Sequence, residues 1–262
     1  MSLLERILAA KRADVATLRA SPAVRLEERR PVDVLAALAR PKGLPLRLVT
    51  EVKLRSPSAG PLSTTLSPAA RALSYARAGA AMVSVLCDGH HFDGSWRHLQ
   101  DAREALDAAG LAVPLLAKEF VIDEAQLREA RARGADAVLL IARIVSAADL
   151  GALARAAREL GLEPLVEITE EAELEAARAA GARLVGVNAR DLDTLRMDAA
   201  RAARVLAAIP EGVVRVHLSG LKTAGDVAAV AASGVDAALV GEALMREDDP
   251  RALLASFVAA AG

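Results

Sequence analysis

The stretch ARARGADAVLLI (residues 130–141) decides the fold, because it joins a helical pattern to a strand pattern through one glycine. Alanine and arginine dominate before Gly134, and that composition favours a helix. A glycine just past the last helical residue is a common stop signal, since glycine adopts the left-handed conformation at no steric cost. The apolar run after it is short, as expected of a strand that is buried on both faces.

The same unit recurs along the chain, as ARAGAAMVSVL (76–86), ARAAGARLVGVN (177–188) and AASGVDAALVG (231–241). Four further apolar runs fit between these units: RLVTEVK (47–53), VPLLAK (113–118), EPLVEI (163–168) and VVRVHL (213–218). Eight strands that alternate with helices indicate a parallel sheet, either in a doubly wound α/β fold or in a (β/α)8 TIM barrel. Eight units in roughly 215 residues match the usual size of the barrel, which we therefore predict.

Residues 1–45 form a predicted N-terminal helical extension. Residues 2–20 carry apolar side chains at helical spacing, which indicates an amphipathic helix. A segment rich in proline and glycine, PKGLP (41–45), separates the extension from the first strand. Since no linker interrupts the repeats, we expect a single barrel domain over residues 1–262.

Composition excludes several functional classes. The 33 Lys and Arg nearly balance the 34 Asp and Glu, so nothing favours bulk attraction to nucleic acid or to a membrane surface. No uncharged run approaches the ~20 residues that span a bilayer. Cys87 is the only cysteine, which fits a reducing cytoplasm. We therefore expect a cytoplasmic, monomeric enzyme that acts on a small molecule.

Polar residues gather where the predicted strands end. Active sites of such barrels lie at the carboxyl ends of the strands. Charged side chains rarely close an apolar strand without a partner. Here several polar residues do so at the same end of the predicted barrel: Glu51, Lys53, Lys118, Glu167, Asn188 and Arg190.

Two glycine pairs mark a predicted phosphate site. Ser219-Gly220 follows the seventh strand and Gly241-Glu242 follows the eighth. Barrels commonly build a phosphate site at these two positions from backbone N–H groups and the start of a short helix. The segment EALM (242–245) is the predicted short helix.

Taken together, these residues resemble the indole-3-glycerol phosphate synthase family. The resemblance covers residues ~45–246 with one motif per strand, and the motifs are EVKLRSPSAG (51–60), SVLCDGHHFDGS (84–95), LLAKEFVID (115–123), LVEITEEAEL (165–174), VGVNARDLDTL (185–195) and VGEALMR (240–246). The resemblance implies a barrel with an extra N-terminal helix. It also implies ring closure, decarboxylation and dehydration of 1-(2-carboxyphenylamino)-1-deoxyribulose 5-phosphate, without a metal or an organic cofactor.

The resemblance also implies roles for individual residues. Lys118 would be the general acid during ring closure, and Glu167 would stabilise the developing cation and act as a base. Lys53 would hold the substrate carboxylate, Glu51 would orient the lysines, and Asn188 would position the substrate. The remaining implied site residues are Ser219, which we place with the catalytic group, Arg190 on the sugar-phosphate chain, Ser56, Gly220, Gly241 and Glu242 around the phosphate, and Phe92 and Phe120 beside the anthranilate ring.

The two lysines carry a further expectation. If Lys53 and Lys118 face one interior, each disfavours the charge of the other, and we expect a pKa lowered towards neutrality. Glu51 and Lys53 are two residues apart, so in a strand they share one face and reach the same substrate.

The seventh strand departs from the family pattern. The family normally reads Glu-Ser-Gly where this chain reads Leu218-Ser219-Gly220. By alternation along a strand, Leu218 shares a face with Val216, and His217 points the other way. Five charged groups at the strand ends sum to +1: Lys53, Lys118 and Arg190 against Glu51 and Glu167. The family Glu would bring this sum to zero. We expect an enzyme that is active but altered.

Two alternatives stay open. Another phosphate-binding barrel enzyme, such as a phosphoribosylanthranilate isomerase, needs a Cys/Asp pair, but Cys87 lies on the wrong strand. A low-activity or silent phosphate-binding barrel is motivated by Leu218, although Lys53, Lys118 and Glu167 argue against it. His90 and His91 suggest a metal site only weakly, because no third ligand follows at a suitable spacing.

Overall fold

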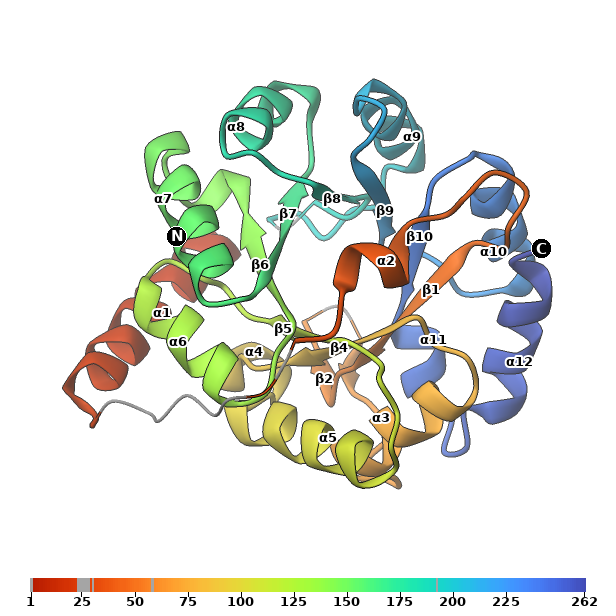
Figure 1. Cartoon of the computed structure of the whole chain (residues 1–262), viewed down its shortest axis with the longest axis horizontal. Helices are drawn as coiled ribbons and strands as arrows, with labels where there is room; N and C mark the ends of the chain where they lie inside the picture. Colours follow the sequence, from red (N-terminus) through yellow and green to blue (C-terminus); the bar gives the residue numbers. More distant parts are fainter. Residues whose placement is uncertain (1, 23–28, 30, 58, 192) are drawn as a thin grey trace.

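The predicted apolar runs form eight parallel strands that close into a barrel (Figure 1). The structure is a computed structural model that describes residues 2–22, 29, 31–57, 59–191 and 193–262. Each barrel strand pairs with the next one along the chain, and the last pairs with the first. The strands are β1 (Arg47–Val52), β4 (Met82–Leu86), β5 (Leu115–Lys118), β6 (Ala137–Ile141), β7 (Glu163–Ile168), β8 (Leu184–Asn188), β9 (Val214–Leu218) and β10 (Ala237–Val240). The barrel is confirmed over the doubly wound alternative.

Helices surround the barrel and connect successive strands (Figure 1). They are α3 (Pro68–Arg77), α5 (Trp96–Ala108), α6 (Glu124–Ala132), α7 (Ala147–Glu159), α8 (Leu174–Ala179), α9 (Ala199–Ala208), α10 (Ala224–Ala232) and α12 (Arg251–Ala260). The glycines of the repeated unit end four of these helices with positive φ angles of 96° at Gly79, 88° at Gly134, 67° at Gly181 and 77° at Gly234. They are C′ residues, as the sequence predicts.

Short elements decorate the loops at the carboxyl ends of the strands. A hairpin of β2 (Arg55–Ser56) and β3 (Gly60–Pro61) follows β1, and it has no counterpart among the predicted elements. The helix α4 (Gly89–Phe92) follows β4, and the predicted helix after the eighth strand is α11 (Glu242–Met245). Two 3-10 turns, η1 (Ala142–Ile144) and η2 (Glu171–Glu173), complete the loops after β6 and β7.

Apolar side chains fill two layers. One lies between the strands and the outer helices, and it includes Val85 and Val187. The other fills the inside of the barrel, with Val49, Leu165 and Leu184 among its members. Successive side chains of a strand alternate between these layers, which is why the strands read as continuous apolar runs.

The N-terminal extension reaches both ends of the barrel. α1 (Leu3–Ala20) packs beside α6, and α2 (Val34–Leu38) places two apolar side chains in the same cluster as the barrel interior. Figure 1 shows α2 lying across the middle of the barrel. Its flanks bind carboxylates that precede strands: the N–H of Val32 donates to Asp136 at 2.8 Å, and that of Arg40 donates to Asp236 at 3.3 Å. α2 therefore covers the end of the barrel where the strands begin.

Within the described ranges, no helix combines the length and the apolar character that crossing a bilayer requires.

Candidate active site

A pocket opens at the carboxyl ends of the barrel strands. Its empty volume is about 1140 Å³, including the open mouth. All thirteen residues that the sequence analysis proposes for the site line it: Glu51, Lys53, Ser56, Phe92, Lys118, Phe120, Glu167, Asn188, Arg190, Ser219, Gly220, Gly241 and Glu242. Two members of the quoted motifs, Ser58 and Leu192, lie outside the described residues. The barrel therefore brings these residues from separate strand ends and loops to one pocket.

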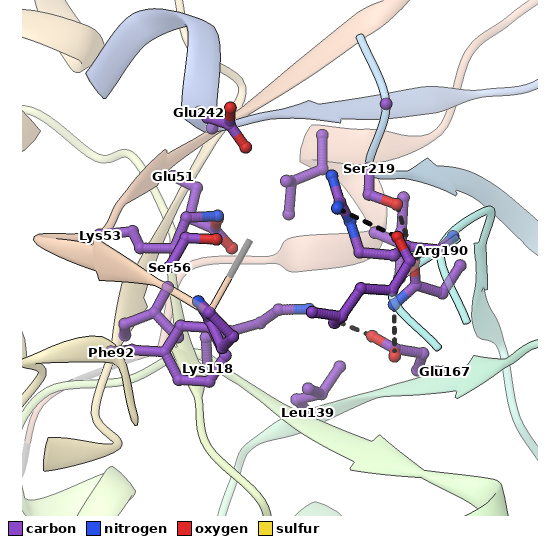
Figure 2. Close-up of a pocket in the computed structure, with 18 of the residues that line it drawn as sticks. Glu51, Lys53, Ser56, Phe92, Lys118, Leu139, Glu167, Arg190, Ser219 and Glu242 are labelled. Atoms are coloured by element: carbon purple, nitrogen blue, oxygen red, sulfur yellow. Dashed lines mark hydrogen bonds and ion pairs between the residues drawn. The ribbon is translucent and has the colours of Figure 1, made fainter. Parts of the chain in front are cut away.

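A chain of hydrogen bonds crosses four strand ends. The ammonium of Lys118 lies 3.1 Å from Oε2 of Glu167, and Nδ2 of Asn188 donates to Oε1 of the same carboxylate at 2.9 Å. The hydroxyl of Ser219 donates to Oδ1 of Asn188 at 2.7 Å. Both oxygens of Glu167 are therefore held, and the Asn188 amide has a defined orientation, because one end donates and the other accepts. Figure 2 shows the network reaching from Lys118 to Ser219.

A second ion pair lies at the end of β1. Nζ of Lys53 is 2.5 Å from Oε1 of Glu51, so the two charges share one face, as alternation predicts. Gly241 lies directly against this pair: a β-carbon there would stand 2.6 Å from Oε1 of Glu51. Only glycine at position 241 leaves the Glu51 carboxylate in its place.

The pKa of Lys118 is raised, and the sequence-based expectation of a lowered pKa is wrong for this residue. Burial alone would lower the pKa of the ammonium, but the carboxylates of Glu167 and Glu51 outweigh it. The expectation failed because it counted only the two lysines, whereas each lysine contacts a carboxylate directly. Lys118 is therefore protonated in the free site.

One side of the pocket has the features of an anion site. Ser219 and Gly220 both take left-handed backbone conformations, with φ of 67° and 95°. Arg190 and Lys53 both lie close enough to Glu242 to lower the pKa of its carboxyl, although burial raises it and Arg246, 2.9 Å away, gives the largest lowering. Two cations therefore lie near the loop after β10.

Another wall of the pocket is apolar and contains two neighbouring rings. The centroids of Phe92 and Phe120 lie 6.1 Å apart with the rings tilted by 32°. Leu3 and Ile7 of α1 line the same pocket, and sequence reasoning did not place them there. Their signal was the apolar stripe of α1, which does not reveal what the stripe covers.

Leu218 belongs to the floor of the pocket, and the predicted orientation of its strand is confirmed. Leu218 is 1% exposed and packs with Val216 in the barrel interior. His217 points outwards, and its Nε2 donates to the carbonyl of Ser219 at 3.0 Å. His217 therefore does not replace the acidic side chain that the family carries here.

Residues outside this pocket have other surroundings. Cys87 is buried in the outer apolar layer, and burial raises the pKa of its thiol. His90 lies 3.0 Å from Asp14, and His91 lies 3.4 Å from Asp88. Across the described ranges, no three His, Cys, Asp or Glu side chains are arranged to hold a metal ion.

The arrangement suits acid–base chemistry on an anionic, partly aromatic molecule. A protonated lysine and an oriented carboxylate, Lys118 and Glu167, face one cavity. Two aromatic rings and the cations of Lys53 and Arg190 line the same pocket. Such a site can protonate a carbonyl oxygen, stabilise a positive charge and remove a proton within one bound molecule.

Comparison with known proteins gives consistent matches. The family model "Indole-3-glycerol phosphate synthase" matches residues 4–257. The indole-3-glycerol phosphate synthase of Parafrankia sp. is 42% identical over 266 residues, which cover 99% of this chain and 96% of the relative. That of Mycobacterium ulcerans is 40% identical over 265 residues, covering 99% and 94%.

Solved structures agree on the architecture. A 3-hexulose-6-phosphate synthase superposes with a TM-score of 0.65 at 18% identity, covering 82% of this chain and 99% of that one. An orotidine 5'-phosphate decarboxylase from Pyrococcus horikoshii gives 0.60 at 16% identity, covering 82% and 98%. At such low identity these structures support the barrel fold alone.

Proposed function

The chain belongs to the indole-3-glycerol phosphate synthase family, and we propose on that premise that its pocket converts 1-(2-carboxyphenylamino)-1-deoxyribulose 5-phosphate to indole-3-glycerol phosphate. The protein is a carboxy-lyase of tryptophan biosynthesis and acts on a small phosphorylated substrate. The observation that carries this assignment to particular residues is the hydrogen-bonded chain from Lys118 through Glu167 to Asn188 at the carboxyl ends of the strands.

Lys118 is the proposed general acid. In ring closure the ring carbon that bears the carboxylate bonds to the ketone carbon, and the ketone oxygen gains a proton. Lys118 carries that proton in the free site, because Glu167 and Glu51 raise its pKa. Its place inside the pocket puts the ammonium within reach of a bound carbonyl.

Glu167 is the proposed stabiliser of positive charge and the proposed base. Ring closure develops an iminium cation, which a fixed carboxylate stabilises without reorganisation. Loss of CO2 then returns the electrons of the broken C–C bond to the ring and neutralises the cation. The methylene carbon beside the nitrogen next gives up a proton to the base as the hydroxyl on the neighbouring carbon departs as water. The bonds to Lys118 and Asn188 fix both carboxylate oxygens, so Glu167 is oriented before the substrate arrives.

Lys53 and Glu51 are proposed to act at the substrate carboxylate. The Lys53 side chain is 15% exposed and that of Glu51 is 4%, so the ammonium is the accessible member of the pair. We infer that Lys53 turns towards the substrate carboxylate, and that Glu51 orients Lys53 and helps to keep Lys118 charged.

The phosphate is proposed to bind between the loops after β9 and β10. Gly220, Gly241, Glu242 at the start of α11, and Ser56 all line the pocket. Arg190 supplies a guanidinium, which suits phosphate oxygens through paired N–H donors. Phe92 and Phe120 hold the aromatic ring on the apolar wall.

We further propose that the chain works as one monomeric barrel domain in the cytoplasm, with residues 1–45 as its extension and no metal or organic cofactor. Acid and base are both side chains of the pocket, so the reaction needs no further group. Among the described residues, the large apolar side chains that are most exposed lie on separate segments: Leu44 in the loop before β1, Met197 in the loop after β8, and Val258 on α12. That scatter favours a monomer.

Leu218 favours one competing function, a low-activity or silent barrel that binds the phosphorylated ligand without turning it over. Its side chain closes the floor of the pocket where the family carries a carboxylate. The intact network of Lys118, Glu167 and Asn188 favours catalysis instead, because a mere binding site does not need an oriented acid–base pair.

One assay separates these functions. The purified protein is mixed with 1-(2-carboxyphenylamino)-1-deoxyribulose 5-phosphate, and indole fluorescence and CO2 release are followed together. We expect both signals to rise in parallel, and to fall by about 100-fold or more in Lys118→Met, the range that a general acid contributes. Binding without either signal would establish the silent barrel. Unchanged turnover in Lys118→Met would remove the proposed acid.

A further inference from the structure

The extension brings one buried cation to the rear of the pocket. Lys11 lies on the apolar stripe of α1 with Leu4, Ile7 and Val15, and its side chain is 2% exposed. A lysine on a buried stripe is rare unless it is paired. Here three carboxylates surround its ammonium: Asp88 at 2.7 Å, Asp14 at 2.9 Å and Glu119 at 3.1 Å.

Two of these carboxylates flank the strand end that carries the proposed acid. Glu119 directly follows Lys118 on β5, and Asp88 directly follows Cys87 beyond β4. The N–H of Cys87 donates to the carbonyl of Lys118 at 3.0 Å. Lys11 binds Asp88 and Glu119, the residues that follow the two partners of this backbone hydrogen bond. It therefore holds the ends of β4 and β5 together.

The same carboxylates hold the aromatic wall. Asp88 caps α4 by accepting from the N–H of His91 at 2.8 Å, and α4 ends at Phe92. Glu119 accepts from the N–H of Phe120 at 2.7 Å. Phe92 therefore lies on a helix that is capped by Asp88, and Phe120 lies next to Glu119. Both carboxylates bind Lys11.

We propose that Lys11 is a positioning residue, whose ammonium sets the aromatic wall and the backbone of Lys118 through Asp88 and Glu119. This inference rests on the proposed function for its kinetic effect, but its structural effect does not depend on that function.

The ammonium of Lys11 balances the buried negative charges of Asp88 and Glu119. Burial would lower the pKa of Lys11, but Glu119 and Asp88 outweigh it and raise that pKa, so the side chain stays charged. Burial raises the pKa of Glu119, and the lowering by Lys11 offsets this only in part. Without the ammonium, the buried carboxylates of Asp88 and Glu119 would face each other beside the partly exposed Asp14, and the two buried groups would separate or take up protons. Either response releases Asp88 and Glu119 from their present places.

The test compares three variants of the full chain. Lys11→Met keeps the length of the side chain and removes the charge, whereas Lys11→Arg keeps the charge. Val15→Ala is the matched control, because Val15 lies on the same buried stripe one helical turn away and contributes packing only. We measure kcat and KM, thermal stability, and amide hydrogen exchange of the segments 87–94 and 118–122.

Lys11→Met is expected to lower kcat/KM by about 10- to 100-fold, because displacement of a positioned group by about 1 Å has that order of effect. Both constants change: KM rises as the rings move, and kcat falls as Lys118 moves. Exchange at the amides of His91 and Phe120 speeds up, since their acceptors are released. Lys11→Arg stays nearer to the wild type than Lys11→Met in all three respects.

The proposal is overturned if Lys11→Met matches Val15→Ala, with lower thermal stability but unchanged kinetics and unchanged exchange in both segments. If Lys11→Met does not fold, Glu119→Gln replaces it: we expect faster exchange at Phe120 and a lower kcat, and the wild-type values of both would refute the idea. If the wild type itself forms no product, the proposed function fails, and the exchange experiment still decides the role of Lys11.

Discussion

The side chain of Leu218 occupies the space that a side chain at Gly186 would need: a β-carbon placed on Gly186 would lie 2.6 Å from Cδ1 of Leu218. Gly186 stands on β8 two residues before Asn188, and Leu218 stands opposite Asn188 in the pairing of β8 with β9. The leucine that departs from the family pattern therefore lies over a glycine and beside the residue that orients Glu167.

Gly186→Ala is expected to destabilise the protein by about 1–3 kcal/mol, the usual cost of overpacking a core. The added methyl group pushes Leu218 out of its place. Because the two sites touch, Leu218→Ala in the same chain should reduce the cost of the alanine, so the double variant loses less than the sum of the single ones. Chemical denaturation of the four proteins measures this coupling. Strict additivity would mean that the contact carries no strain.

Leu218→Glu is expected to raise kcat/KM by about tenfold, which corresponds to roughly 1.4 kcal/mol at the transition state. The new carboxylate would lie beside Asn188. It would bring the summed charge of the five strand-end groups Lys53, Lys118, Arg190, Glu51 and Glu167 from +1 to zero. The gain has a cost in stability of about 1–3 kcal/mol, because a polar group enters a nearly closed apolar floor. Steady-state kinetics decide the matter, with Leu218→Gln as the uncharged control. A lower kcat/KM in Leu218→Glu than in the wild type would show that the leucine is no deficit.

The ammonium of Lys118 is expected to keep its proton beyond pH 10. Its folded pKa is raised, so the ion pair with Glu167 is fully formed below the ordinary value of about 10.5 and is lost only as the pH rises through the higher folded value. The chain has only five lysines, which makes NMR titration of their side-chain carbons practical. Lys118→Met identifies the signal, and Glu167→Gln should move its midpoint to lower pH. A midpoint below that of a free lysine would contradict the pairing.

His217 is expected to make the protein less stable in acid. Burial lowers its pKa, and the bond to Ser219 offsets this only in part. The unfolded chain therefore binds a proton near pH 6.5 that the folded chain refuses, so stability falls as the pH drops through that value, by at most about 1.4 kcal/mol per pH unit. Thermal unfolding between pH 7.5 and 5 should show a smaller loss in His217→Gln. A loss in His217→Gln equal to that of the wild type would exclude His217 as the source.

The sequence was most informative where one physical rule acts on each residue separately. Strands that are buried on both faces must be apolar, and glycine is a common residue at helix ends. The eight apolar runs and the glycines before them therefore predicted the barrel. The carboxyl ends of parallel strands meet at one edge, so the polar residues there could be assigned to a single pocket before any contact was known. Glu51, Lys118 and Glu167 are of this kind.

Contacts between distant segments were not predictable in this way. Leu3 and Ile7 carry no sign that they line the pocket, because an apolar stripe does not name its partner. Lys11 looked like an ordinary helical lysine, although its acceptors lie 77 and 108 residues further along the chain. The direction of the Lys118 pKa shift failed for the same reason, since it depends on a carboxylate 49 residues away. Such effects need the three-dimensional neighbours of a residue.

The covering of the barrel floor by α2 bears on how the protein is made. Arg40 donates to the carbonyl of Ala231 and to the carboxylate of Asp236, which the ribosome adds 191 and 196 residues later. At bacterial or eukaryotic synthesis speeds this delay is roughly 10–40 s, during which Val34 and Leu38 have no barrel to cover. α2 is thus made before every barrel strand and is among the last elements to find its place. In a nascent chain of this protein, the apolar side chains of α2 stay exposed until β10 emerges. They are therefore a site to which chaperones can bind.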